Sequence, residues 1–418
     1  MSNIGGAETD SEDELPSAWE ERVTNEGNVY YLNHQTKSTQ WTHPRTNKMK
    51  KVTGSLPYGW EKKVEEDGRI LFINAEKNVQ SFTDPRLAFA QEEAGQSIRQ
   101  KFDSSSTALS VLHGKDLTGK IALITGSNIG IGLETARSLA FHGCEIIFAC
   151  RNRQTTMEAM EKLNEERRGN CKLNFIQLDL SSLRSTKNFC EEVKRQYQKI
   201  DFLILNAGIF GLPYGTTEDG LERHFQVNHL SHQFLTTQLS ELLNHESRVV
   251  VLSSESHRFS NFPKHDLTKE ILSPSASKFS SMMAYNNAKL CNVLFACELA
   301  RKWQSRGISV FAVHPGNMIS TGISRNWWFW RFLFVLVRPF TKSLQQGAAT
   351  TVYCTTAPEL TGLTGIYFNN CYICEPSKLS QNEDLAKELW NLSEKLIKEI
   401  FENYGDGAAG GTGMFIGN

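Results

Sequence analysis

Residues 121–143 read IALITGSNIGIGLETARSLAFHG, which is an apolar run, a glycine-rich turn and a segment with helical periodicity. The turn follows the pattern Thr-Gly-x-x-x-Gly-x-Gly. Glycine permits a tight turn and lets a pyrophosphate approach the backbone N–H groups at the start of the helix. The pattern therefore predicts a strand–turn–helix unit that cradles a nucleotide through Thr125, Gly126, Ser127, Asn128, Ile129, Gly130, Ile131 and Gly132.

Similar apolar, β-branched runs recur downstream and alternate with segments long enough for a helix. They lie at 145–151, 172–180, 201–208, 248–256, 308–316 and 365–370. Strands buried on both faces, with helices between them, are typical of a doubly wound parallel sheet. Near the end of the chain a helix is expected, with one apolar face made of Leu385, Leu389, Leu392, Leu396 and Ile400. We therefore expect an α/β fold of the Rossmann type over residues 119–403.

The end of the second run indicates which ribose the cradle receives. NAD sites carry an acidic residue about 20 residues after the glycines, but residues 149–152 read ACRN and contain no carboxylate. Arg151 can neutralise a 2′-phosphate, which favours NADP(H) over NAD(H); the alternative is an ordinary surface arginine. Asp179 is expected beside the adenine, and Asn206, Ala207 and Gly208 where the backbone approaches the cofactor closely.

Tyr285 and Lys289 are four residues apart at the start of a segment that we interpret as an amphipathic helix. This spacing places both side chains on one helical face. An adjacent ammonium and a cationic nicotinamide would lower the tyrosine pKa from about 10, so that Tyr285 could act as a general acid and base. Ser254 ends the fifth run, at the sheet edge where ligands bind, and Asn228 is expected on the preceding helix.

In this order, the motifs resemble those of the short-chain dehydrogenases/reductases. The resemblance implies that Tyr285 is the proton donor and acceptor, that Lys289 binds the nicotinamide ribose, that Ser254 binds the substrate oxygen, and that Asn228 supports a water relay. It also implies cofactor contacts from Pro315 and Gly316 and hydride transfer between the cofactor and a carbonyl or alcohol carbon.

Two repeats precede this region, at 15–45 and 56–86, and they align without a gap. Each holds short β-rich runs broken by turn residues, Asn25–Gly27 in the first and Asp67–Gly68 in the second, which predicts a small three-stranded sheet. In the first repeat, Trp19, Tyr31 and Pro44 are expected to form the core. The other face would present a groove made of Tyr30, Leu32, His34, Thr39 and Trp41. Such aromatic ridges can bind a polyproline II ligand, although the aromatics could instead serve only to stabilise the small fold.

The second repeat keeps the core residues Trp60, Phe72 and Pro85 but changes the groove. Leu71, Ala75 and Phe82 replace its tyrosine, histidine and tryptophan. We therefore expect a retained fold with weakened ligand binding.

Both repeats resemble WW domains, through Leu-Pro-x-x-Trp at the start of each and, in the first, Tyr-Tyr-x-Asn-His and Trp-x-x-Pro. The resemblance implies that the first binds Pro-Pro-x-Tyr partners.

The composition excludes several other classes. Lys+Arg is 45 and Asp+Glu is 46, which argues against a nucleic-acid binder. Nine cysteines in 418 residues do not make a disulfide scaffold, and Cys371-x-x-Cys374 has no second pair, so we expect no metal site. No apolar run reaches about 18 residues, so no membrane-spanning helix is expected. Asn326–Val337, NWWFWRFLFVLV, is expected to border a cleft for a large apolar substrate or to form a lid that touches a membrane; the alternative is a buried helix.

The predicted organisation is an acidic leader (1–14), WW domains (15–48 and 56–89), a connector (90–118), the oxidoreductase domain (119–403) and a Gly-rich tail (404–418). This arrangement is similar to a family of oxidoreductases that carry WW domains. The similarity implies a steroid- or retinoid-like substrate and a role in apoptosis, tumour suppression and Wnt signalling. It also implies a cytoplasmic protein that visits the nucleus, mitochondrion or Golgi, with a homodimer among the expected assemblies. The alternative is an adaptor whose oxidoreductase fold binds nucleotide with little turnover.

Overall fold

The chain forms two compact units, Met1–Arg99 and Gln100–Asn418, in this computed structural model. The structure describes residues 15–16, 18–24, 29–45, 49–52, 56, 59–65, 70–74, 78–86, 91–93, 101–168, 171–316 and 342–405. Several predicted features therefore lie outside the described residues: the acidic leader, the turns at 25–27 and 67–68, Ala75, the aromatic segment 326–337 and nearly all of the Gly-rich tail.

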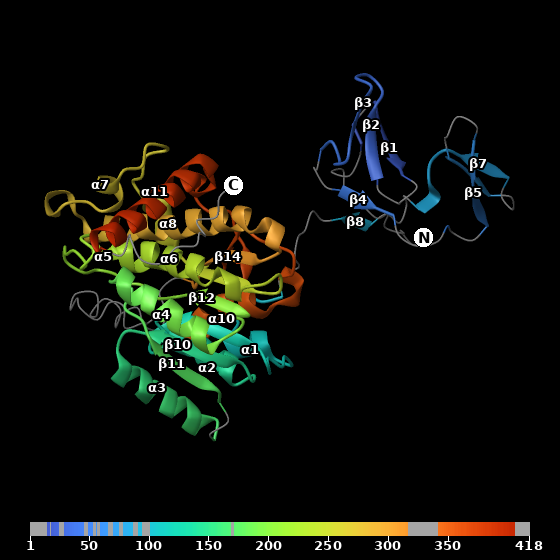
Figure 1. Cartoon of the computed structure of the whole chain (residues 1–418). Coiled ribbons are helices and arrows are strands. Elements are labelled where there is room, and N and C mark those ends of the chain that lie inside the picture. Colours follow the sequence, from blue (N-terminus) through green and yellow to red (C-terminus); the bar gives the residue numbers. More distant parts are fainter. Residues whose placement is uncertain are drawn as a thin grey trace, which may run out of the picture. The chain divides into compact units, whose positions relative to one another are not determined.

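The first unit contains two three-stranded antiparallel sheets, as the repeats predict (Figure 1). The first sheet has β1 (Trp19–Val23), β2 (Val29–Asn33) and β3 (Ser38–Gln40) in that order. The second has β5 (Trp60–Val64), β6 (Ile70–Asn74) and β7 (Val79–Ser81) in the same order. Tyr31 and Phe72 occupy equivalent positions and are both buried, which confirms their prediction as core residues.

The segment between the repeats belongs to this core, which the sequence does not reveal. Strand β4 (Met49–Lys51) pairs with β8 (Gln91–Glu93), which follows the second repeat. Val52 is buried against Val29 and Tyr31, and Lys50 Nζ lies 3.4 Å from Glu21 Oε1. Lys50, in the segment between the repeats, therefore has a structural role, because it forms an ion pair with the first sheet.

The second unit is built on one eight-stranded sheet with the order β11-β10-β9-β12-β13-β14-β15-β16. Its strands pair in parallel except for the last, β16, which is antiparallel to β15. The bounds are β9 (Ile121–Thr125), β10 (Glu145–Cys150), β11 (Leu173–Gln177), β12 (Phe202–Leu205), β13 (Arg248–Leu252), β14 (Ser309–His314), β15 (Ile366–Asn369) and β16 (Tyr372–Ile373). The first seven coincide with the seven apolar runs, so the predicted Rossmann-type doubly wound sheet is confirmed.

Helices cover both faces of this sheet (Figure 1). One face packs on α4 (Leu183–Gln196), α6 (Ser231–Gln238) and α8 (Ser281–Lys302). The other helices that contact strands include α2 (Gly130–Ala140), α3 (Arg153–Glu166) and α10 (Leu344–Thr356). The short α1 (Ala108–Leu112), within the predicted connector, packs against α10 and α2. The remaining short helical segments are α5 (Arg223–Phe225), η2 (Gln226–Leu230), η3 (Ser240–Leu242), η4 (Glu255–Phe259), α7 (Lys269–Leu272), η5 (Ala276–Lys278), η6 (Gln304–Arg306), η9 (Pro358–Leu360) and η10 (Lys378–Gln381).

The final helix, α11 (Glu383–Asn403), has the predicted apolar face and changes the environment of α8. Leu385, Leu389 and Leu396 of α11 are buried in a cluster with Leu290 and Leu294 of α8. The amphipathic prediction for α8 is therefore wrong, since α11 covers the side that would otherwise face water and most of α8 is buried.

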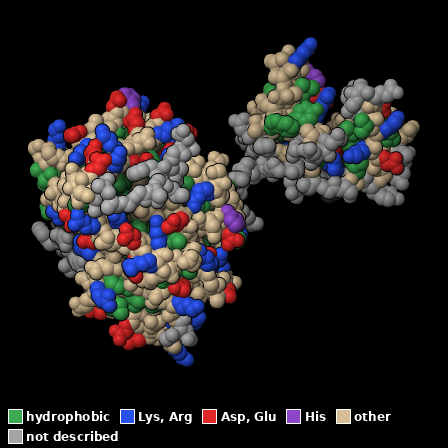
Figure 2. Space-filling view, viewed as in Figure 1, with side chains coloured by type: hydrophobic (Ala, Val, Ile, Leu, Met, Phe, Trp, Pro, Cys, Tyr) green, Lys and Arg blue, Asp and Glu red, His purple; other side chains and the backbone are tan. Residues whose placement is uncertain are grey.

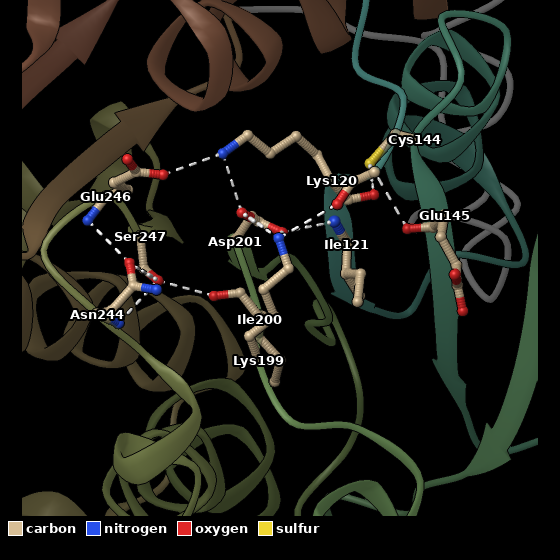
Figure 3. Close-up of polar contacts among 11 residues, drawn as sticks. Lys120, Ile121, Cys144, Glu145, Lys199, Ile200, Asp201, Asn244, Glu246 and Ser247 are labelled. Carbon is tan, nitrogen blue, oxygen red and sulfur yellow. Dashed lines mark hydrogen bonds and ion pairs between the residues drawn. The ribbon is translucent and has the colours of Figure 1, made fainter.

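At the amino ends of the central strands, a buried aspartate joins two neighbouring segments of the chain (Figure 3). Asp201, 4% exposed, accepts hydrogen bonds from Ile121 N at 2.9 Å and from Lys120 Nζ at 3.1 Å. Lys199 Nζ lies 3.0 Å from the same carboxylate. These contacts fix β9 to β12 at the edge of the sheet opposite to the glycine-rich turn.

The surface and the helices carry two general features. Lys/Arg and Asp/Glu side chains are interspersed over the face of the second unit that Figure 2 shows. Within the described part of the chain, no helix has both the length and the apolar character needed to cross a bilayer.

Candidate functional site

The glycine-rich turn lies at the carboxyl end of β9 and is shaped by close backbone contacts. Gly126 has a φ of +64°, and a Cβ there would be 3.0 Å from Ala207. A Cβ on Gly132 would be only 2.4 Å from the carbonyl oxygen of Gly126. Both positions therefore require glycine, the first for its conformation and its contact, the second for its contact alone.

The start of α2 offers the amide groups that a pyrophosphate needs. Its N-cap residue is Ile129, which makes no side-chain capping bond and is 49% exposed. The first N–H groups of a helix have no partner within the helix and carry a partial positive charge. Since the N-cap side chain makes no bond to them, the turn and α2 fit a phosphate-bearing cofactor.

Thr125 joins the turn to the next strand of the sheet. Its hydroxyl oxygen accepts hydrogen bonds from Asn206 N and Ala207 N, both at 2.9 Å. Asn206 Nδ2 donates in return to the carbonyl oxygens of Thr125 and Gly126, at 2.8 and 3.1 Å. The structure thus brings the predicted residues Asn206 and Ala207 against the cradle, because β12 lies beside β9.

The residues predicted for the adenosine end lie at the same edge of the sheet. Arg151 follows β10 directly and is exposed. Asp179 follows β11, and its Oδ1 accepts hydrogen bonds from the N–H and hydroxyl of Ser181 at 2.9 and 2.7 Å. Asn128 Nδ2 donates to Thr155 Oγ1 at 2.8 Å, which links the turn to α3. Among the other predicted residues, Ser127 is buried and donates to Ile124 O at 3.0 Å, while Ile131 lies in the first turn of α2.

Ser254, Tyr285 and Lys289 converge beside this cradle. Ser254 lies beyond β13 and caps η4 (Glu255–Phe259) by accepting from Ser256 N at 3.2 Å. Tyr285 and Lys289 lie on α8, and the tyrosine side chain is hydrogen-bonded to that of Ser254. The lysine Nζ donates to Leu252 O at 3.1 Å and lies 5.6 Å from the centroid of the Tyr285 ring.

Burial shifts the pKa values of both titratable side chains of this cluster, Tyr285 and Lys289. It raises the pKa of Tyr285 to about 12, an effect that the hydrogen bond with Ser254 opposes. Burial also lowers the pKa of Lys289 to about 8. Desolvation is the larger cause of this raised pKa, whereas the lowering expected from the sequence depends on the ammonium of Lys289 together with a bound cationic nicotinamide.

Asn228 lies in a π-helical turn, η2 (Gln226–Leu230), inserted between α5 (Arg223–Phe225) and α6. Its Oδ1 accepts from Ile209 N at 2.7 Å and its Nδ2 donates to Ile209 O at 3.1 Å. A Cβ on Gly208 would be 3.3 Å from Asn228 Oδ1 and 3.6 Å from Lys289 Nζ. Asn228, Gly208 and Lys289 are therefore neighbours, as the motif order implies; π-helical turns of this kind are frequent at functional sites.

Pro315 and Gly316 follow β14, the next strand at this edge. Gly316 has a φ of +107°, and a Cβ there would be 2.7 Å from Lys342 Nζ. The lysine is also hydrogen-bonded to Asn370 Oδ1.

The structure adds two aromatic neighbours that no motif identifies. The rings of Phe210 and Tyr285 meet edge to face with 4.8 Å between their centroids. Phe259, at the end of η4, is 71% exposed. Phe210 lies two residues after Gly208 in the sequence. Its closeness to the Asn206–Gly208 motif is the signal that could have identified it.

The first small sheet presents the predicted groove residues on one face. The rings of Tyr30 and Trp41 are 5.9 Å apart, and Trp41 is 53% exposed. Leu32 pairs with Thr39 across β2 and β3, on the same side. His34 Nε2 lies 2.7 Å from Glu20 Oε2, and Glu20 is in turn bound by Arg22 at 3.0 Å. The face thus carries an exposed tryptophan packed on a half-buried tyrosine, bordered by the Glu20–Arg22 ion pair and His34.

The second small sheet differs at the same places. Phe82 is 49% exposed at the position of Trp41, and Leu71 is half-buried at the position of Tyr30. Only one aromatic ridge is therefore present here among the described residues.

Known proteins share both parts of the chain. Residues 120–263 match the family model described as short chain dehydrogenase, and residues 15–44 match the WW domain. The chain is 61% identical over 402 residues to a protein of Drosophila melanogaster called WW domain-containing oxidoreductase, covering 94% of this chain and 98% of the relative.

Other relatives share the second unit. Retinol dehydrogenase 12 of Mus musculus is 39% identical over 283 residues, covering 67% of this chain and 87% of that protein. A crystal structure of an uncharacterised protein from Mycobacterium paratuberculosis superimposes with a TM-score of 0.55 at 27% identity, covering 70% and 98% of the two chains. This chain therefore belongs to the WW domain-containing oxidoreductase family, and its second unit is a short-chain dehydrogenase domain.

Proposed function

We propose that the protein is an NADP(H)-dependent oxidoreductase of alcohol and carbonyl groups, guided to its partners by the first WW domain. The observation that carries this proposal is the cluster of Ser254, Tyr285 and Lys289 beside a close-packed glycine cradle. The tyrosine is hydrogen-bonded to the serine. Gly208 lies next to the lysine Nζ and directly follows Ala207, whose N–H donates to Thr125 in the cradle.

In this mechanism the substrate oxygen lies between the hydroxyl groups of Ser254 and Tyr285. When bound, NADPH would supply the hydride that reduces the carbonyl carbon. Tyr285, whose pKa of about 12 keeps it protonated at neutral pH, donates its proton to the developing alkoxide. Lys289, with a pKa of about 8, can exchange a proton near neutral pH and stabilises the tyrosinate that forms. Asn228 supports the water relay that returns the proton.

The preference for NADP(H) rests on Arg151. Arg151 directly follows β10 and is exposed. Residues 149–152, which include it, contain no carboxylate. A guanidinium there favours a 2′-phosphate and no acidic residue is present to bind a 2′-hydroxyl.

We infer a large apolar substrate, of the retinoid or steroid class. Phe210 packs on the Tyr285 ring, and Phe259 is exposed just beyond Ser254. Aromatic side chains near the reacting oxygen favour an apolar ligand body. The mouse relative named retinol dehydrogenase 12 supports this class.

The partner function belongs to the first WW domain. We propose that the Tyr30–Trp41 pair binds Pro-Pro-x-Tyr segments and that this targeting serves signalling in apoptosis and tumour suppression. Exposing a tryptophan beside a tyrosine to water is energetically unfavourable unless a ligand covers the rings.

The test is a screen of NADPH oxidation by the purified full chain against retinal, steroid ketones and aliphatic carbonyls. Turnover should appear with the large apolar carbonyls and should be abolished in Tyr285→Phe, while the Kd for NADPH stays within about threefold. A wild-type protein that binds NADPH but reduces none of them would favour the adaptor alternative.

A further inference from the structure

Three histidines, His224, His229 and His232, are fully buried near the site. One of them, His232 in the first turn of α6, makes contacts that join the cofactor cradle to Asn228.

The hydrogen-bond partners of Thr125 fix the direction of the first contact. A hydroxyl group has one proton and two acceptor lone pairs. Asn206 N and Ala207 N both donate to Thr125 Oγ1 at 2.9 Å and so occupy its acceptor positions. The third partner, His232 Nε2, is also at 2.9 Å. The threonine proton therefore points to Nε2, which must be an acceptor.

The second contact follows from the first. A neutral imidazole has one protonated and one bare nitrogen. Burial lowers the pKa of His232 to about 4, so the ring is neutral at physiological pH. Since Nε2 is bare, Nδ1 carries the proton and donates it to the carbonyl oxygen of Asn228, which is 3.1 Å away.

We propose that His232 is a positioning residue, which as the Nδ1–H tautomer holds Asn228 in register with the nucleotide cradle. Asn228 lies in the π-helical turn η2, where an inserted residue disturbs the regular ladder and leaves its position to be set by side-chain contacts. Its side chain binds Ile209, next to Gly208, while its carbonyl oxygen is bound by His232. A shift of this ring would move the relay and the Asn206–Ala207 turn together. The inference rests on the function proposed above.

Two substitutions distinguish the two hydrogen bonds of the His232 side chain, because each keeps one bond and removes the other. The amide nitrogen of asparagine occupies nearly the place of Nδ1, so His232→Asn keeps the donor to Asn228 and loses the acceptor for Thr125. The amide of glutamine reaches the place of Nε2, so His232→Gln keeps a partner for Thr125 and loses the donor to Asn228. One hydrogen bond of this kind is worth about tenfold in an equilibrium or a rate.

The matched controls are His229→Asn and His229→Gln. His229 is as deeply buried and stands one helical turn away, but its ring packs on Phe225 and Phe295 and its Nε2 lies 3.4 Å from Ser393 of α11. These variants test whether any polar change in the same buried region has the same effect.

In the full chain, His232→Gln should lower kcat of carbonyl reduction about tenfold, with the Kd for NADPH within twofold of wild type. His232→Asn should raise that Kd about tenfold, with kcat at saturation within threefold. Both His229 variants should leave both constants near wild type. If the four variants instead lower kcat and weaken NADPH binding alike, His232 is only a core residue and the inference falls.

A readout independent of turnover distinguishes this inference from the proposed function. In the NADPH-bound full chain labelled with ¹⁵N-histidine, the resonances that vanish in His232→Asn should show Nδ1 protonated and Nε2 bare. A proton on Nε2 would overturn the inference even if carbonyl reduction is observed. If the wild-type protein reduces no carbonyl, the proposed function fails, while the tautomer and the NADPH affinities still decide the role of His232.

Discussion

Lys289 Nζ donates to the carbonyl oxygen of Leu252 at 3.1 Å, and Asn292 Nδ2 donates to the same oxygen at 2.9 Å. Leu252 is the last residue of β13, two residues before Ser254. The lysine is 5% exposed, and burial lowers its pKa to about 8. One strand end therefore positions both Ser254 and the side-chain amine of Lys289.

This arrangement predicts how stability depends on pH. In the unfolded chain the lysine pKa is about 10.4, so between pH 8 and 10.4 the unfolded state binds more protons at this site than the folded state does. Stability must then rise with pH across this window because of Lys289. Relative to Lys289→Met, the wild-type protein should gain about 2–3 kcal/mol between pH 7 and pH 10, measured by urea unfolding.

The comparison with the variant is essential, since burial raises the pKa of Tyr285 and of several thiols, among them Cys291 and Cys297. Those groups make the folded state bind more protons at high pH and lower the stability of both proteins alike. A stability difference that does not change with pH would contradict the shifted lysine pKa.

The strands of the second unit could be predicted from the sequence because each is a short apolar run that the sheet buries on both faces. Val249–Val251 and Val310–Val313 are examples: burial depends on composition within the run, which is local information. The cradle could also be predicted, because its glycines follow a strand at a fixed spacing, although the atoms that exclude a Cβ at Gly126 and Gly132 include those of Ala207 and Asn206, which follow β12.

Features that depend on distant segments could not be predicted. Val52 gains its place in the first core from the pairing of β4 with β8, across the whole second repeat. The outer side of α8 is covered by α11, which begins just over a hundred residues after the start of α8 (Ser281 to Glu383). The role of His232 depends on Thr125, and nothing near either residue in the sequence records that contact.

Asp201→Asn should destabilise the fold without affecting the site. Burial alone would raise the pKa of Asp201, but hydrogen bonds from Ile121 N, Lys199 and Lys120 hold it below its ordinary value. Removing the charge leaves these donors with a weaker partner, so we expect a loss of about 2–4 kcal/mol in unfolding free energy at pH 7. Because this cluster lies at the opposite edge of the sheet, the Kd for NADPH should be unchanged.

The stability measured at acid pH gives a second test of the role of Asp201. A carboxyl with a lowered folded pKa stabilises above its unfolded pKa of about 3.9, and that stability is lost as the pH falls through the folded value. The disadvantage of Asp201→Asn should therefore shrink below pH 4. Asp266→Asn is the control, because the Asp266 side chain is 87% exposed and should change stability by less than about 0.5 kcal/mol.

Arg151→Gln should weaken NADPH binding about tenfold or more while the Kd for NADH stays within twofold, since only NADPH carries the 2′-phosphate. Arg153→Gln is the matched control. Arg153 is two residues away, but its guanidinium lies 5.6 Å from the centroid of the Phe175 ring. Fluorescence titration with both cofactors measures the effect. Equal losses for NADPH and NADH in Arg151→Gln would remove the argument for NADP(H).

Trp41→Ala should weaken binding of a Pro-Pro-x-Tyr peptide to the full chain by roughly 30- to 1000-fold in Kd, because an aromatic anchor at a binding site is worth about 2–4 kcal/mol. The side chain is 53% exposed and packs on the Tyr30 ring rather than in the core, so the first sheet should keep its fold. Phe82→Ala, at the equivalent exposed place in the second sheet, should leave the titration unchanged, since its neighbour is Leu71 instead of a tyrosine. Isothermal titration calorimetry distinguishes the two, and a comparable loss in Phe82→Ala would show that the second sheet contributes a ligand contact of its own.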